Sequence, residues 1–337
     1  MAMCVLLALL AGCAQEPRTG RHAFFALGTL VEISVYDPPE DFDEILRDVE
    51  ARLLEQEHRW RAWGDGTLAN INERLAAGDA VALDAAMLAG IERARDIAQR
   101  SGGRFNPAIG RMIETWGFNV EERDAGPPPA DSELATLLPP PTLLALEQTG
   151  DGLWRSADSR LWIDMGAFAK GLAVETAIAA LRGHGIENAV VNAGGDLKVI
   201  GQHGARPWRI GVRDPRGDGV LAAVDASGNE SVFTSGDYER FFEWEGVRYH
   251  HIIDPATARP ARGVTSVTVI HSDAALADAA ATALFVAGPG EWRATARALG
   301  VDKVMIVLEN GRVEMTPEME ERVEFVDSAP HAEIPAP

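Results

Sequence analysis

The sequence predicts an α+β fold, with mixed sheets and flanking helices. Its predicted strands come in runs with the helices grouped between them, whereas a parallel sheet would alternate one strand with one helix. The chain has 337 residues, of which 46% are hydrophobic and 24% charged, so it is long and apolar enough to bury a sizeable core. The same composition excludes wholesale disorder and a polytopic membrane protein.

The first half of the chain begins with a strand and two amphipathic helices. Residues 27–36 alternate apolar and polar side chains, which is typical of a strand. Apolar residues then recur at helical spacing after Asp41 or Asp43 and again after Asp84, and each aspartate is a credible N-cap. Residues 60–72 are mixed and polar, so we expect a loop or an irregular stretch between the two helices.

Two Pro-Pro-Pro triplets divide the chain. They bracket residues 121–141, which can form neither a central strand nor a continuous helix, and we interpret this segment as an excursion or linker. Beyond it we expect, in chain order, a hairpin around residues 157–159, a helix over 167–181, a strand over 188–191, short strands over 208–212, 220–224, 238–244 and 247–253, helices over 274–286 and 291–299, and a hairpin turning at 310–311.

Both cysteines lie within the first thirteen residues. Leu10-Ala11-Gly12-Cys13 follows a short apolar run and resembles the bacterial lipobox, in which the signal is cut before a lipidated cysteine. We therefore expect a signal peptide over 1–13, lipidation of Cys13, a tether over 14–23, a folded domain over 24–327 and a flexible tail over 328–337. The absence of Lys and Arg from residues 2–12 favours the alternative, an apolar N-terminus of a cytoplasmic protein.

The charge balance limits the partners of the protein. It has 51 Asp and Glu against 31 Lys and Arg, a formal net charge of -20. Such a surface repels polyanions, which argues against sequence-independent binding of nucleic acid. A ligand that carries phosphate needs a local group to overcome this negative field.

One pair of oxygen-bearing side chains suits a metal ion. Asp278 and Thr282 are four residues apart on a predicted helix, so they project from one face. A carboxylate and a hydroxyl are hard ligands, suited to Mg²⁺ rather than to zinc. This spacing is also common on a solvated helix face, but here the neighbours are mostly alanines, among which an unpaired carboxylate would be costly.

Glycine-bearing turns and one histidine pair supply further candidates. Residues 192–196 leave a strand through two glycines, a pattern that suits either an anion cradle or a tight hairpin. Residues 164–171 lead into a helix and include Lys170, so they suit a phosphate or an ordinary helix start. His250 and His251 have no third His or Cys at ligand spacing, which favours a single histidine acting as a base over a metal half-site.

Seven motifs in chain order carry a resemblance to a known family. They are Leu27-Gly28-Thr29, Phe105-Asn106-Pro107 with Trp116-Gly117-Phe118, Asp164 to Gly171, Asn192 to Leu197, Thr234-Ser235-Gly236 with Tyr238, His251 to Pro255, and Ala277-Asp278 with Thr282. This set, over residues 24–315, resembles the ApbE family, the FAD:protein FMN transferases. The resemblance implies an enzyme that binds FAD in a cleft, uses Mg²⁺, transfers FMN to a threonine of a target flavoprotein and releases AMP.

The resemblance also assigns roles to residues of this sequence. It implies that the side chains of Asp278 and Thr282 and the backbone carbonyl of Ala167 hold the metal ion, and that His251, oriented by Asp254, is the base. The residues that match FAD contacts are Leu27, Trp63, Arg104, Phe105, Asn106 and Asp164. Where the family has Phe-Asp-Pro-Thr, this chain has Phe105-Asn106-Pro107-Ala108, which removes a carboxylate and a hydroxyl near the flavin.

The family is typically exported and often lipid-anchored, in agreement with the lipobox. The resemblance therefore implies a location on the periplasmic side of a bacterial membrane and an acceptor flavoprotein from an electron-transfer system. Two other functions stay open. One is a Mg²⁺-dependent FAD pyrophosphatase that uses water as the nucleophile at the same site, and the other is a non-enzymatic flavin-binding lipoprotein.

Overall fold

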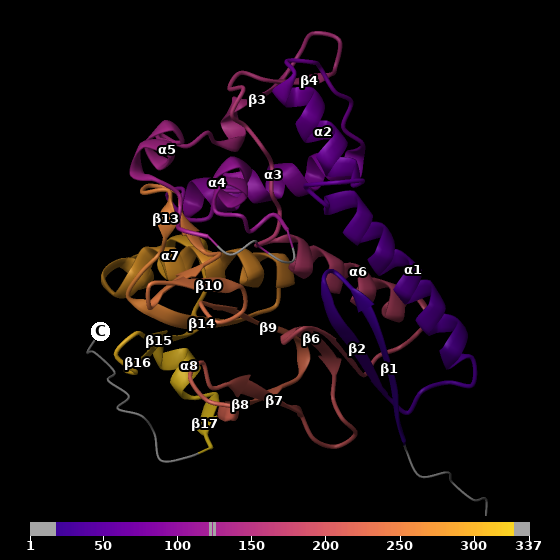
Figure 1. Cartoon of the computed structure of the whole chain (residues 1–337). Coiled ribbons are helices and arrows are strands. Elements are labelled where there is room, and N and C mark those ends of the chain that lie inside the picture. The colour runs from indigo at the N-terminus through magenta and orange to yellow at the C-terminus, as the bar shows by residue number, and fades with distance from the viewer. Residues whose placement is uncertain (1–17, 121–122, 124–125, 327–337) are drawn as a thin grey trace, which may run out of the picture.

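The centre of the molecule is an eight-stranded antiparallel sheet (Figure 1). The computed structural model describes residues 18–120, 123 and 126–326. The strands, in their order across the sheet, are β1 (Thr19–Ala26), β2 (Thr29–Tyr36), β5 (Ala189–Ala193), β6 (Asp196–Gly201), β9 (Gly228–Gly236), β14 (Val264–His271), β15 (Lys303–Leu308) and β16 (Val313–Met315). The antiparallel pairing confirms the α+β class.

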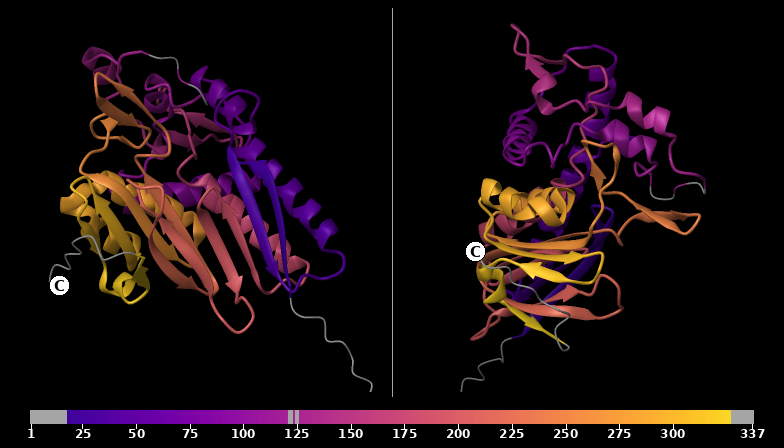
Figure 2. Two further views of the ribbon diagram at one scale, coloured as in Figure 1. Left: turned by 60° about the horizontal axis from the view of Figure 1, so that its bottom comes forward. Right: turned by 90° about the vertical axis from the view of Figure 1, so that its left-hand side faces the viewer.

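Both faces of this sheet are covered, so its side chains alternate between two cores. α1 (Phe42–Trp60), α6 (Ala169–Gly183) and α7 (Ala274–Leu299) pack on one face, and a three-stranded sheet packs on the other (Figure 2). In β5, Val191 enters the helical core and Val190 enters the other. The smaller sheet has the order β17 (Val323–Phe325), β8 (Val220–Ala226) and β7 (Trp208–Arg213), and α8 (Pro317–Glu320) precedes β17.

A second group of short elements lies over the helical layer (Figure 1). Its members are α2 (Thr67–Ala76), α3 (Ala85–Arg100), α4 (Gly110–Thr115), α5 (Asp131–Thr136), the 3₁₀ turn Leu143–Ala145, and the hairpin of β3 (Leu146–Gln148) and β4 (Trp154–Ser156). The buried Trp116 centres a third core beside two short ribbons. These ribbons are β10 (Phe241–Trp244) with β11 (Val247–His250), and β12 (Ile253–Asp254) with β13 (Arg259–Pro260).

Most of the expected elements are confirmed. Asp84 caps α3, because its side chain accepts a hydrogen bond from the Met87 N–H at 2.7 Å. The two helices expected over 274–286 and 291–299 are the two arms of α7, which kinks at Gly288 (φ 68°) before Pro289. The hairpin expected at 310–311 joins β15 to β16.

The first correction concerns the N-terminal edge of the sheet. We expected a tether over 14–23, but β1 begins at Thr19 and pairs with β2 along its whole length. Phe24 packs against the helical core, which gives this strand a reason to stay in place. The strand expected over 27–36 begins only at Thr29, because residues 27 and 28 form the turn of the hairpin.

Three further expectations need correction. The loop expected over 60–72 contains most of α2, whose apolar residues Leu68 and Leu75 are buried. The hairpin expected around 157–159 turns instead between β3 and β4, where Asp151 accepts a hydrogen bond from Thr149. The strand expected over 238–244 begins only at Phe241, because residues 237–240 form the turn that leaves β9.

The chain termini bear on the localisation prediction. The signal peptide with Cys13, residues 14–17 of the tether and the tail over 328–337 lie outside the described residues. Within the part of the chain that the structure describes, no helix is long and apolar enough to span a membrane.

Candidate functional site

A cavity of about 1240 Å³ forms where α1, α6 and α7 meet the turns of the central sheet. It brings together side chains that are up to 257 positions apart, from Phe25 near the end of β1 to Thr282 in α7. Nine of the ten site residues predicted from the sequence line it: Leu27, Arg104, Phe105, Asn106, Asp164, Ala167, His251, Asp278 and Thr282.

Trp63 is the exception. Its ring is half-buried and stacks on Trp162, with the ring centroids 6.5 Å apart, and it is absent from the cavity wall. The cavity wall next to α1 is formed instead by Trp60 and Arg61. The structure therefore gives Trp63 a packing role and does not bring it to the other predicted FAD contacts.

Asp278 is held where α6 meets α7. A Cβ on Gly171 would lie 2.5 Å from the Ala274 carbonyl oxygen, so only glycine lets the two helices approach this closely. The Gly171 N–H then donates to Asp278 Oδ2 at 2.9 Å. The carboxyl is 5% exposed, and burial raises its pKa to about 7, against the opposing effect of Lys170.

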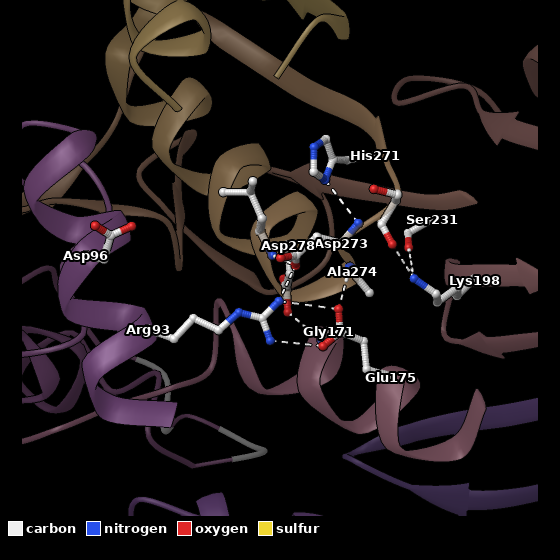
Figure 3. A network of polar contacts seen from close by, with 12 residues as sticks. Arg93, Asp96, Gly171, Glu175, Lys198, Ser231, His271, Asp273, Ala274 and Asp278 are labelled. Carbon is white, nitrogen blue, oxygen red and sulfur yellow. Dashed lines mark hydrogen bonds and ion pairs between the residues drawn. The ribbon is translucent and has the colours of Figure 1, made fainter. Parts of the chain in front are cut away.

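An ion-pair network fixes the start of the helix that carries Asp278 (Figure 3). Arg93 of α3 donates to Glu175 of α6 at 2.9 Å and also pairs with Asp273, the N-cap of α7. Glu175 accepts in turn from the Ala274 N–H at 2.9 Å. Three helices that are distant in sequence are thereby held together about one turn from Asp278.

The donor set around Asp278 fits a hard cation. Thr282 lies one helical turn further along α7, and its hydroxyl is 3.0 Å from that of Ser235 on β9. Ala167 lines the same cavity just before α6. Among the described residues there is no cluster of three or more His, Cys, Asp or Glu side chains arranged for a metal. One carboxylate, one hydroxyl and one carbonyl leave most positions to water and ligand oxygens, which suits Mg²⁺.

Lys170 and the buried Asp196 form an ion pair beside this donor set, with the Lys170 side chain partly exposed. Asp196 is 3% exposed, and its other oxygen accepts from the Thr234 N–H at 2.8 Å. Burial alone would lower the pKa of Lys170, but the Asp196 carboxylate, with Glu239 and Asp278, raises it above its ordinary value. Lys170 therefore stays charged. The sequence had placed Asp196 only in a glycine turn, which proves to be the β5–β6 hairpin.

His251 lies at the root of the β10–β11 ribbon. Its backbone N–H donates to the Arg240 carbonyl at 3.1 Å, and its ring Nδ1–H donates to the same oxygen at 3.2 Å. Burial, reinforced by the positive charge of Arg240, lowers the pKa of His251 to about 3. The ring is therefore neutral at physiological pH with its proton on Nδ1, so Nε2 has a free lone pair.

The two groups beside His251 in the sequence have structural roles. His250 is 2% exposed and donates through Nε2 to the Ala261 carbonyl at 2.8 Å, so the histidine pair forms no metal half-site. Asp254 accepts from the Ala256 N–H at 2.9 Å and from the Thr257 hydroxyl at 3.0 Å, which holds the following turn. The sequence indicated Asp254 as the residue that orients His251. In the structure the Arg240 carbonyl holds the ring instead.

The predicted FAD contacts are also held by their own hydrogen bonds. Leu27 has a left-handed backbone (φ 58°), stabilised where its N–H donates to Glu57 at 3.0 Å. Asn106 is 8% exposed, and its amide donates to the Pro141 carbonyl at 3.0 Å and accepts from the Ala108 N–H at 3.0 Å. The excursion over 121–141 is thereby tied to the cavity wall.

Five cationic side chains line the cavity, and they differ in their partners. Arg61, Arg104 and Lys170 are each paired with a carboxylate. Arg213 and Arg240 form no direct ion pair among the described residues, although both lie near enough to Glu239 to oppose the rise that burial causes in its pKa, and Arg213 is 5.2 Å from the Tyr238 ring centroid. In a chain of net charge -20, these two guanidinium groups favour an anionic ligand.

Comparison with known proteins identifies the family. The ApbE family model matches residues 27–305. The chain belongs to the ApbE family. A protein of Rhodobacter capsulatus named FAD:protein FMN transferase is 42% identical over 94% of this chain, although the match spans only 60% of that relative. A protein of the same name from Treponema pallidum is 33% identical over 96% of this chain and 95% of its own length.

Solved structures of the ApbE family share the fold. The ApbE protein of Thermotoga maritima has a TM-score of 0.82 and 34% identity, covering 90% of this chain and 99% of its own. The flavin transferase ApbE of Vibrio cholerae has a TM-score of 0.79 and 25% identity over 91% and 99% of the two chains. The resemblance seen in the sequence and the expected class of enzyme, a transferase, are confirmed.

Proposed function

We propose that this ApbE protein transfers FMN from FAD to a threonine hydroxyl of an acceptor flavoprotein, with Mg²⁺ as cofactor and AMP as the leaving group. The observation that supports this most is the shared cavity. One wall holds a hard-oxygen donor set, Asp278 and Thr282, and another holds a neutral histidine with a free ring nitrogen. A phosphoryl-type transfer needs both features, because charge must be neutralised and a hydroxyl must lose its proton.

The metal would be held by Asp278, Thr282 and the Ala167 carbonyl. When bound, Mg²⁺ supplies positive charge that neutralises the diphosphate and the departing AMP. Asp278 is poised for such a cation, because its buried carboxylate has only the Gly171 N–H as a hydrogen-bond partner among the described residues. Lys170 keeps Asp196 neutralised, so that this second carboxylate does not repel the substrate.

The two unpaired guanidinium groups would bind the phosphates of FAD. Arg213 ends β7 and Arg240 precedes β10, so they reach the cavity from different elements. Arginine suits this task because its planar donors match phosphate oxygens two at a time. The same groups would offset the acidic field of the protein where the anionic substrate enters.

His251 would act as the general base. The acceptor hydroxyl gives its proton to Nε2 while its oxygen bonds to the FMN-side phosphorus, and the bond from that phosphorus to the bridging oxygen breaks. AMP leaves with that bonding electron pair. The Arg240 carbonyl keeps the proton of the resting ring on Nδ1, and the basic nitrogen therefore remains available.

We also propose that the protein is anchored through Cys13 on the periplasmic side of a bacterial membrane. The support is the lipobox-like Leu10-Ala11-Gly12-Cys13 sequence after a short apolar run. Metabolic labelling with a lipid precursor, comparing wild type with C13S, tests this part. Unchanged labelling of C13S would refute it.

The test of the activity uses purified protein lacking residues 1–13, FAD, Mg²⁺ and an acceptor domain with a candidate threonine. Covalent flavin is read by in-gel fluorescence, and AMP by chromatography. A labelled acceptor and an equal amount of AMP, both abolished by EDTA, support the proposal. AMP without label would identify a pyrophosphatase, and bound FAD with neither product would identify a flavin carrier.

A further inference from the structure

The β1–β2 hairpin carries an exposed apolar pair at its turn. Phe25 and Leu30 face each other across the two strands, and they are 79% and 41% exposed. The side chains on this face of the hairpin, two residues apart along each strand, are Thr19, Arg21, Ala23, Phe25, Leu30, Glu32, Ser34 and Tyr36. Tyr36, at the far end, packs against the core of the smaller sheet, whereas Phe25 and Leu30 are exposed next to the turn.

The fold itself does not require this pair. The other face of the hairpin supplies the core contacts, through Phe24, Val31 and Ile33. Single exposed apolar residues are common on protein surfaces and need no explanation. An aromatic and an aliphatic side chain that face each other form a small apolar patch, and its location on the fold can therefore be informative. Here that position is the end of the hairpin that carries Leu27.

One member of this pair, Phe25, lies on the wall of the cavity of the proposed active site. Phe25 lines the cavity together with Leu27, and so does Val120, which is 49% exposed. The same cavity contains His251 and Asp278. The exposed apolar surface is thus continuous with the site where a hydroxyl would be activated.

We propose that Phe25 and Leu30 form a docking surface for the acceptor flavoprotein, where they contact an apolar side chain near the threonine that receives FMN. This inference rests on the proposed function. A threonine on a protein can reach His251 only if the surrounding acceptor surface lies against the cavity rim. With the acceptor docked over the cavity mouth, Phe25 would lie near the buried centre of the interface, where aromatic side chains are enriched and a few residues carry most of the binding energy.

The test compares F25A with wild type and with L144A. Leu144 is a matched control, because it is also exposed (58%) but lies in the 3₁₀ turn and does not line the cavity. Binding of a fluorescently labelled acceptor domain to the FAD-free enzyme is measured by anisotropy. The affinity for FAD and the KM and kcat for the acceptor are measured separately.

We expect F25A to weaken acceptor binding and raise the acceptor KM about tenfold, equivalent to about 1.4 kcal/mol. FAD affinity, kcat and all values for L144A should stay within about twofold of wild type. A combined F25A/L30A variant should weaken acceptor binding further. Because Phe25 is 79% exposed, F25A should keep the thermal stability of wild type, and the double variant should lose little because Leu30 is also exposed.

Several outcomes overturn the inference. If F25A binds the acceptor as tightly as wild type does, Phe25 is not part of a docking surface, whether or not FMN is transferred. If F25A lost as much affinity for FAD as for the acceptor, Phe25 would contact the flavin instead of the acceptor. If L144A weakened acceptor binding as much as F25A, the effect would not be specific to the cavity rim. A wild-type enzyme that binds the acceptor through Phe25 but transfers no FMN would refute the proposed function and leave the docking surface supported.

Discussion

Replacing Asn106 with Asp gives the residue that the sequence resemblance implies at this position, yet we expect N106D to destabilise this protein. The Asn106 amide donates to the Pro141 carbonyl at 3.0 Å and accepts from the Ala108 N–H at 3.0 Å, within a site that is 8% exposed. An aspartate keeps the second bond. It places a second acceptor opposite the Pro141 carbonyl, which loses its donor and faces a negative charge.

The size of this effect follows from the two losses. An unsatisfied buried carbonyl costs about 1–3 kcal/mol, and a poorly solvated carboxylate adds to this, so we expect about 2–4 kcal/mol above neutral pH. Because a protonated carboxyl can donate to Pro141, the folded state should raise the pKa of the new side chain. The loss of stability is then small below pH about 4, which is the pKa of the side chain in the unfolded state. It is complete above the raised pKa of the side chain in the folded state.

Equilibrium urea denaturation at pH 5 and pH 8 measures this effect. N70D is the control, since Asn70 is exposed on α2 and receives the same change in charge. The control should stay within about 0.5 kcal/mol of wild type. If N106D is as stable as wild type at pH 8, the hydrogen-bond argument for asparagine is wrong.

Three further predictions concern the cavity. Burial raises the pKa of Asp278 to about 7, so its ionisation destabilises the metal-free protein as the pH rises from about 4 to 7. In EDTA, D278N should therefore be more thermally stable than wild type between pH 5 and pH 8. Added Mg²⁺ should not stabilise D278N, and an increase in its melting temperature with Mg²⁺ would contradict Asp278 as a metal ligand. H251A should lower transfer about a hundredfold or more with FAD affinity unchanged, and because the His251 pKa is about 3, the wild-type pH–rate profile should show no His251-dependent fall between pH 8 and 5.5. R240A should weaken FAD binding about tenfold in a titration of flavin fluorescence, with partial recovery in R240K, and equal affinities in all three proteins would exclude phosphate binding.

The hydrophobic pattern of the sequence predicted those helices and strands that have a clear apolar periodicity of their own. The alternating strand that became β2, the Asp84-capped α3 and the kinked α7 all have hydrophobic periods long enough to stand out. β1 was missed because its short sequence shows little apolar alternation, and its pairing with β2 and the packing of Phe24 on the core hold it in place. α2 was missed because it is only ten residues long and its first buried apolar residue, Leu68, lies within a mixed and polar stretch of the sequence.

The sequence by itself determined the family, the α+β class and the residue types of the site, because these depend on ordered motifs that sit at strand ends and helix starts. Tertiary structure alone decided which groups meet. It joined Lys170 to Asp196, gave the orientation of His251 to Arg240, and removed Trp63 from the cavity wall. These contacts join residues from different elements or from the two ends of one ribbon, and local sequence patterns do not show which of them meet.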